Sequence, residues 1–197
     1  RDPYIDFNIA VGKLKEGSWK QRRLTVIYRL ISRFTDLSIF PSMVYEEELL
    51  SRGLSSKNSL GIFRGVDGSL FKETGQGGKI RQELGIREKF VVGWFGMMLP
   101  NRRIEEVIIP LIERAQNHIS NIHFLIGGKG ELEMKFIELQ SKNPKVPMNN
   151  LGFVPYRNLP QYIAACDVLL CPLKMDDRFD RNASPLKILE ALAVGRP

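Results

Sequence analysis

The chain has 197 residues, a formal net charge of +7 and 43% hydrophobic residues, which is enough to bury one core and part of a second. No run approaches the ~20 apolar residues of a transmembrane helix, and the start does not resemble a signal peptide. The two cysteines form no C-x-x-C pair, which is usual for free thiols in a reducing compartment. This composition argues against a membrane-spanning or disulfide-stapled protein, and we expect a cytoplasmic location.

A strongly basic helix is predicted near the start of the chain. Its apolar residues recur at helical spacing, at Leu24, Ile27, Tyr28, Ile31 and Phe34. Residues 13 to 33 contain seven basic side chains against Glu16 alone, a net of +6 out of +7. Two interpretations stay open: the apolar stripe packs on its own domain, which we favour, or the helix lies on an anionic membrane surface. Nucleic-acid binding is disfavoured because no recognisable module accompanies the charge.

The rest of the chain alternates between predicted strands and helices. A short strand at 37–42 leads into a helix at 43–51, which Gly53 stops. Continuous apolar runs then predict buried parallel strands at 89–96, 121–126 and 167–172, with a further short strand at 151–155. The helices predicted between them span 102–117, 131–140 and 159–165. This alternation predicts an α/β fold with a Rossmann-like, doubly wound parallel sheet.

The last predicted helix begins with residues suited to a charged, hydroxylated ligand. Ser184 can cap it and Pro185 suits an early helical position, while the free amides of a first turn attract anions. Lys187 adds a positive charge, and Glu190 can accept hydrogen bonds from a vicinal diol such as a ribose. Phosphate and ribose together indicate a nucleotide. The alternative is a solvated Lys–Glu pair on a helix surface.

Six stretches, in a fixed order, carry a resemblance to a known family. They are Ser38-Ile-Phe-Pro-Ser42, Gly65-Val-Asp67 with Phe71, Val92-Gly-Trp-Phe-Gly-Met-Met-Leu-Pro-Asn-Arg102, Phe124-Leu-Ile-Gly-Gly-Lys-Gly130, Leu151-Gly-Phe-Val-Pro155 leading to Ala165-Cys-Asp167 and Pro172, and Asn182 to Pro197. They resemble the retaining group 1 glycosyltransferases of two-domain GT-B architecture, which include sucrose synthases and bacterial mannosyl- and glucosyltransferases. The resemblance implies that residues 1–60 are the tail of an N-terminal acceptor-side domain. Residues 61–197 would then be a truncated C-terminal donor-binding domain, so that the sheet is incomplete at both ends of the chain.

The resemblance implies that Arg102 and Lys187 bind the donor diphosphate. The family usually places an arginine directly after the strand glycine, where this chain has Met97, which cannot neutralise phosphate. Arg102 replaces the usual lysine with a cation that can bind in bidentate fashion, and Arg103 is a further candidate.

The same resemblance implies roles for the remaining site residues. Phe153 and Val154 would form a wall of the base pocket, Glu190 would bind the ribose, and Asn182 with Ser184 would lie near the donor sugar. Asn182 stands where the family has the first glutamate of its pair, and it carries no charge to stabilise a developing cation. The catalytic groups are expected outside this chain.

The implied activity is transfer of a hexose from a UDP- or GDP-linked sugar to an acceptor hydroxyl with retention of anomeric configuration. The acceptor would be a glycan or glycolipid. No cofactor and no metal are expected, since His118 and His123 belong to no metal-binding motif. The alternative is a nucleotide-sugar-binding module without transfer activity, which Met97 and Asn182 motivate.

Overall fold

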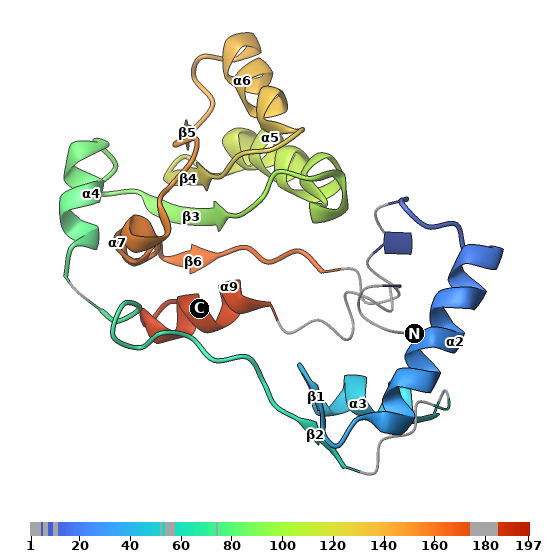
Figure 1. Cartoon of the computed structure of the whole chain (residues 1–197). Coiled ribbons are helices and arrows are strands. Elements are labelled where there is room, and N and C mark those ends of the chain that lie inside the picture. Colours follow the sequence, from blue (N-terminus) through green and yellow to red (C-terminus); the bar gives the residue numbers. More distant parts are fainter. Residues whose placement is uncertain are drawn as a thin grey trace. The chain divides into compact units, whose positions relative to one another are not determined.

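The computed structural model describes residues 5, 8–9, 12–51, 53, 58–73, 75–173 and 185–197. These residues fall into two compact units, one that runs up to Gly65 and also contains Leu173, and one that consists of Val66–Pro172 and Pro185–Pro197. Figure 1 traces the elements of both units along the chain. The domain boundary expected from the sequence at residue 60 stays a prediction.

The first unit contains two helices and a two-stranded parallel sheet. Helix α2 spans Trp19–Phe34 and begins at Ser18, whose hydroxyl accepts a hydrogen bond of 3.3 Å from the Gln21 amide. Strand β1 (Ser38–Phe40) pairs in parallel with β2 (Ser59–Gly61), and helix α3 (Met43–Ser51) lies between them in the chain. The strand and helix predicted at 37–51 are therefore present.

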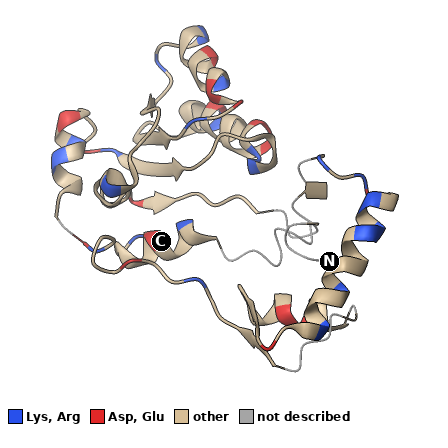
Figure 2. Ribbon diagram, viewed as in Figure 1, with Lys and Arg blue, Asp and Glu red and all other residues tan. Residues whose placement is uncertain are grey.

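Helix α2 exposes most of its apolar stripe among the described residues. Leu24 and Tyr28 are half-buried, but Ile27, Ile31 and Phe34 are exposed, and the phenyl ring of Phe34 lies 86% open to solvent. The fully buried positions of the helix are polar, Gln21 and Ser32. Lys and Arg residues occur along its length, as Figure 2 shows.

The second unit is built on a four-stranded parallel sheet in the order β5-β4-β3-β6. The strands are β3 (Phe90–Phe95), β4 (Ile122–Gly127), β5 (Met148–Asn150) and β6 (Val168–Leu169). All but the first residue of β3 are buried, as its continuous apolar run predicts. The strand expected at 151–155 lies instead at Met148–Asn150, and residues 151–155 form an irregular segment after it.

Two hydrophobic layers cover the faces of this sheet. Alternate residues of β3 point to opposite sides, so Trp94 packs with α5 (Ile109–His118) and α6 (Glu133–Lys142). On the other face Val91 and Phe95 pack with α4 (Gly77–Glu83) and α7 (Leu159–Ala164) and with Val194, which follows α9 (Leu186–Ala193). The sheet is thus enclosed on both sides, and its strand ends are left to form a site.

The helix predicted at 102–117 has a different start. Pro100–Arg102 form a 3-10 turn, Arg103 adopts a left-handed conformation (φ 55°), and Ile104–Ile108 form a π-helical turn before α5 begins. Pro110 explains the wide turn, because it has no amide to bond the carbonyl four residues back and its ring would press on that carbonyl. Arg102 therefore lies before the helix rather than on it.

Candidate functional site

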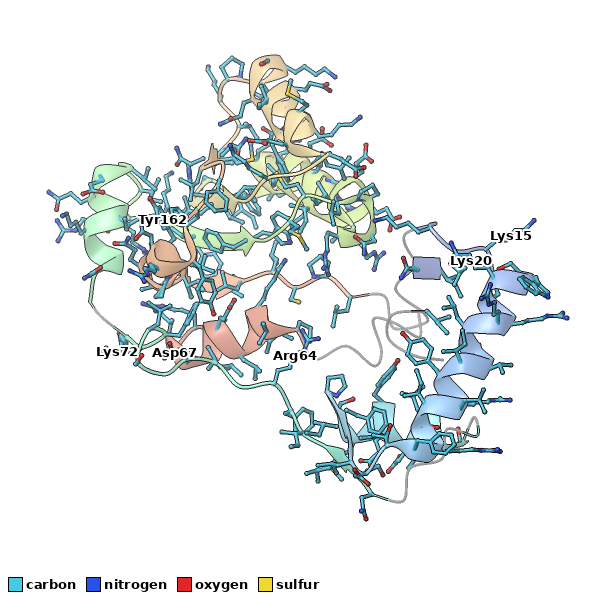
Figure 3. The ribbon with its side chains drawn as sticks, viewed as in Figure 1. Lys15, Lys20, Arg64, Asp67, Lys72 and Tyr162 are labelled. Atoms are coloured by element: carbon cyan, nitrogen blue, oxygen red, sulfur yellow. The ribbon has the colours of Figure 1, made fainter. Side chains whose placement is uncertain are left out.

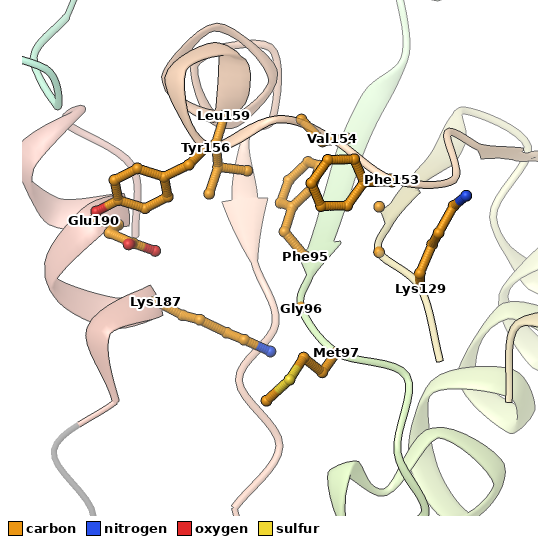
Figure 4. A pocket seen from close by; sticks show the side chains of 12 residues that line it. Phe95, Gly96, Met97, Lys129, Phe153, Val154, Tyr156, Leu159, Lys187 and Glu190 are labelled. Atoms are coloured by element: carbon orange, nitrogen blue, oxygen red, sulfur yellow. The ribbon is translucent and has the colours of Figure 1, made fainter. Parts of the chain in front are cut away.

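A pocket of about 490 Å³ opens at the carboxyl ends of β3 and β4, within the second unit. Its lining comes from four places: the residues that follow each strand, the segment from Phe153 to Leu159, and the inner face of α9 (Figure 4). Ligands of open parallel α/β sheets bind at this edge, where loops diverge from the strands.

Glycines make room for the pocket. Gly96 follows β3, and a β-carbon there would overlap the Lys187 side chain. Gly128 follows β4 with φ of 151°, and a β-carbon there would overlap the carbonyl oxygen of Gly96. The backbones of the two loops pack directly against each other. The Lys187 ammonium, from α9, occupies the space beside Gly96.

Lys187 reaches into the pocket from the first turn of α9. Its Nζ lies 4.5 Å from the centroid of the Trp94 ring, a cation–π contact with a side chain that is 0% exposed. The pKa of Lys187 is lowered to about 8, mainly by burial and to a smaller extent by the nearby charge of Arg102, while Cys171 and Glu190 act in the opposite direction. An anion in the pocket would raise the pKa of this lysine again and so stabilise its charged form.

The predicted diphosphate residues Arg102 and Lys187 lie near one another, since the charge of Arg102 acts on the pKa of Lys187. Lys187 lines the pocket but Arg102 does not. Met97 lines it with an exposed side chain. Arg103 is engaged elsewhere, because its Nε donates to the Glu106 carboxylate at 3.1 Å.

Glu190 lies one turn further along α9 and is only 6% exposed. Burial raises the pKa of its carboxyl group, and a hydrogen bond from Tyr156 and the charge of Lys187 partly counteract that rise. Lys187 and Glu190 therefore line one pocket, and they do not form a solvated pair on the helix surface.

The opposite wall of the pocket is apolar. Phe153 and Val154, the predicted base-pocket residues, both line it, and Phe153 is 65% exposed. Phe95 and Leu159 complete this wall. A flat aromatic ligand would find stacking and dispersion contacts here, while its polar groups face α9.

The other two predicted site residues, Asn182 and Ser184, lie outside the described residues. Helix α9 starts at Leu186, and its cap residue is Pro185, which adopts an extended conformation.

Trp94, Lys129 and Tyr156 are among the lining or supporting residues that are missing from the sequence prediction. Trp94 is hidden within a core strand, and only its position two residues before Gly96 links it to the site. Tyr156 directly follows the predicted base-wall segment, so an aromatic residue with a hydroxyl at that place was an available signal.

Two other features are absent from the part of the chain that the structure describes. No cluster of three or more His, Cys, Asp or Glu side chains occurs among them with the arrangement that a metal ion needs. Within the same part of the chain, every helix is too short or too polar to cross a membrane.

Comparisons with known proteins agree with this geometry. Residues 89–197, more than half of the chain, match the family model described as glycosyl transferases group 1. The chain therefore belongs to this family. No curated protein matches the sequence.

Solved structures with the same fold include several glycosyltransferases. HepE of Anabaena, solved with UDP and glucose, is 26% identical with a TM-score of 0.65 over 91% of this chain and 47% of HepE. Sucrose-phosphate synthase from Thermosynechococcus elongatus is 22% identical with a TM-score of 0.65 over 96% of this chain and 47% of that one. TarM of S. aureus, in a complex that includes UDP, is 16% identical with a TM-score of 0.66 over 93% of this chain and 33% of TarM.

These matches define the fold as the Rossmann-like α/β architecture of GT-B glycosyltransferases. This confirms the fold class and the family expected from the sequence. The chain spans about half the length of HepE and of sucrose-phosphate synthase.

Proposed function

We propose that this chain holds the donor site of a glycosyltransferase that moves a hexose from a UDP-sugar to an acceptor hydroxyl with retention of anomeric configuration. One observation carries the proposal: the ammonium of Lys187 and the carboxylate of Glu190 face one pocket at the carboxyl edge of the sheet in a group 1 glycosyltransferase. We favour UDP over GDP because HepE, which is 25% identical over 91% of this chain, was solved with UDP-glucose.

Each part of the donor has a counterpart in the pocket. The base lies against Phe153 and Val154, and the ribose hydroxyls donate to Glu190. The diphosphate meets Lys187, with Arg102 adding positive potential beside it. Asn182 and Ser184 are proposed near the donor sugar.

Catalysis in this proposal rests on stabilising the leaving diphosphate. As the bond from the sugar to the diphosphate breaks, negative charge grows on the diphosphate and positive charge grows on the sugar ring. Lys187 lies in a partly desolvated position, so its charge interacts more strongly with that developing anion than a surface lysine would. The groups that activate the acceptor hydroxyl are proposed outside this chain. The reaction needs no cofactor and no metal.

The acceptor is proposed to be a glycan or glycolipid handled in the cytoplasm, at the inner face of the membrane. The exposed basic and apolar side chains of α2 support a contact with anionic lipid.

A nucleotide-sugar-binding module without transfer activity is the second candidate, and Met97 in the pocket favours it because the expected arginine is missing there. Incubating the full protein with UDP-glucose and candidate acceptors separates the two. An enzyme releases UDP in step with a new glycoside, and proton NMR of that product gives the anomeric configuration. A β-linked product would overturn retention, and UDP-glucose bound without turnover would favour the module.

A further inference from the structure

Tyr156 connects the candidate site to a buried aromatic residue. It opens the turn Tyr156–Asn158, and its ring lies 5.2 Å from that of Phe71 at an interplanar angle of 56°. Phe71 is 1% exposed and belongs to the core on this face of the sheet. The tyrosine ring is therefore held by packing on one side and open to the pocket on the other.

The segment that carries Phe71 is itself fixed. The Asp67 carboxylate accepts hydrogen bonds from the Ser69 amide at 2.9 Å and the Ser69 hydroxyl at 2.6 Å, which closes a tight turn. Figure 3 shows Asp67 in this segment, ahead of α4. The Phe71 amide donates to the Asp67 carbonyl at 2.8 Å, so the residue that supports Tyr156 has little freedom to shift.

The Tyr156 hydroxyl lies close enough to the buried carboxylate of Glu190 to act as a hydrogen-bond donor on its pKa. Figure 4 shows the tyrosine hydroxyl directed at that carboxylate. A glutamate has three side-chain torsions, and its two oxygens offer about four acceptor positions. A single fixed donor selects one orientation of the group and leaves the remaining positions to a ligand.

We propose that Tyr156 is a positioning residue that makes the site selective for ribonucleotides over 2′-deoxyribonucleotides. It does so by holding Glu190 in the orientation that accepts from both ribose hydroxyls. This inference rests on the proposed function, in which Glu190 binds the ribose. A site built around fixed polar groups rejects a ligand that lacks a matching hydroxyl, because one of its buried acceptors is then left unpaired.

Tyr156 also acts on the charge of Glu190. Burial raises the pKa of that carboxyl group. The Tyr156 hydroxyl lowers this pKa, and so does the positive charge of Lys187. Without the hydroxyl, Glu190 takes up a proton at a higher pH and becomes a poorer acceptor. Removing the hydroxyl should therefore move the acid limit of UDP binding to higher pH.

The test uses the full protein with Tyr156→Phe, which keeps the ring and its packing on Phe71. The matched control is Tyr162→Phe on α7, a second tyrosine that does not line the pocket (Figure 3). Calorimetry measures the affinities for UDP and 2′-deoxy-UDP between pH 5 and pH 8. We expect the unaltered protein to prefer UDP by about tenfold. Tyr156→Phe should lower UDP affinity about three- to tenfold, change 2′-deoxy-UDP affinity less than about twofold, and raise the acid limit. Tyr162→Phe should change none of these.

An equal loss for both ligands, or no loss for either, would overturn the positioning role. If Glu190→Gln abolishes the preference for UDP while Tyr156→Phe retains it, the ribose contact stands and only the role of Tyr156 fails. An unaltered protein that binds no UDP would overturn this inference together with the proposed function.

Discussion

Helices α2 and α9 carry the two charge patterns that stand out in the sequence, and the structure places them in opposite ways. The arginines of α2 are exposed along its length, while its buried positions are occupied by Gln21 and Ser32. In α9 the charged residues turn inward, and Leu186, Ile188 and Leu192 are among its exposed side chains.

The difference shows that the number of charges is a weaker indicator of a ligand site than their burial. A single lysine on α9 lies on the face of a buried tryptophan, and a single glutamate is 6% exposed and bonded to a tyrosine. Holding charged groups in such places costs free energy that a complementary ligand recovers. Exposed arginines are well solvated and carry no such cost.

Removing the pocket lysine gives the largest expected effect. Lys187→Ala should weaken UDP binding by about 2–3 kcal/mol, because a partly desolvated contact to phosphate is lost. Uridine binding should stay within about 0.5 kcal/mol, since the nucleoside has no phosphate. Calorimetry with both ligands measures this.

The matched control for the comparison of the helices is Lys20→Ala on α2, which should change neither affinity. If Lys187→Ala weakened uridine as much as UDP, the damage would lie in folding rather than in the diphosphate contact.

Glu190→Gln should have the next largest effect, about 1–2 kcal/mol, from the loss of charged hydrogen bonds to the ribose. Unlike Lys187→Ala, it should weaken uridine and UDP alike, because both contain the ribose. Glu138→Gln, on α6 and outside the pocket, is the control. Unchanged uridine affinity in a folded Glu190→Gln protein would remove Glu190 from the site.

UDP binding should weaken at high pH because Lys187 loses its charge. Because burial lowers its pKa to about 8, the charged form prevails at pH 7 and falls to about one tenth at pH 9. UDP affinity should therefore decrease by about 1.4 kcal/mol as pH rises from 7 to 9.

Lys187→Arg should abolish this decrease, since a guanidinium stays charged over the whole range. The same decrease in Lys187→Arg would assign the titration to another group.

We expect the contact of α2 with lipid to be weaker and more sensitive to salt than the contacts of Lys187 and Glu190 with UDP. Each basic residue near an anionic surface contributes about 1 kcal/mol, and the Debye length falls from about 10 Å at 0.1 M to about 3 Å at 1 M salt. The full protein should sediment with anionic vesicles at low salt, bind neutral vesicles poorly, and be released as salt rises. Replacing Arg22, Arg29 and Arg33 with alanine should reduce this binding. An absence of sedimentation with either vesicle type would favour packing of the apolar stripe within the protein.

The alternation of elements was predictable because buried parallel strands have continuous apolar runs that end at glycines. Strand β3 lies where its apolar run predicts it, and helix α3 lies in the range predicted for it. The start of α5 was not predictable in the same way, because the π-helical turn at Ile104–Ile108 depends on how one proline, Pro110, fits the turn before it.

The site was predictable only where its residues share one helix or one segment. Lys187 and Glu190 are three positions apart, and Phe153 and Val154 are adjacent. Tyr156 escaped prediction because its partner Glu190 is 34 residues away in the sequence, and only the folded chain brings them together.

A crystal structure of the full protein with UDP would show the donor site itself. We expect diphosphate oxygens within about 3 Å of the Lys187 ammonium, ribose hydroxyls bonded to Glu190, and uracil against Phe153 and Val154. UDP bound away from α9, or bound in this pocket with its phosphates turned away from Lys187, would contradict this expectation.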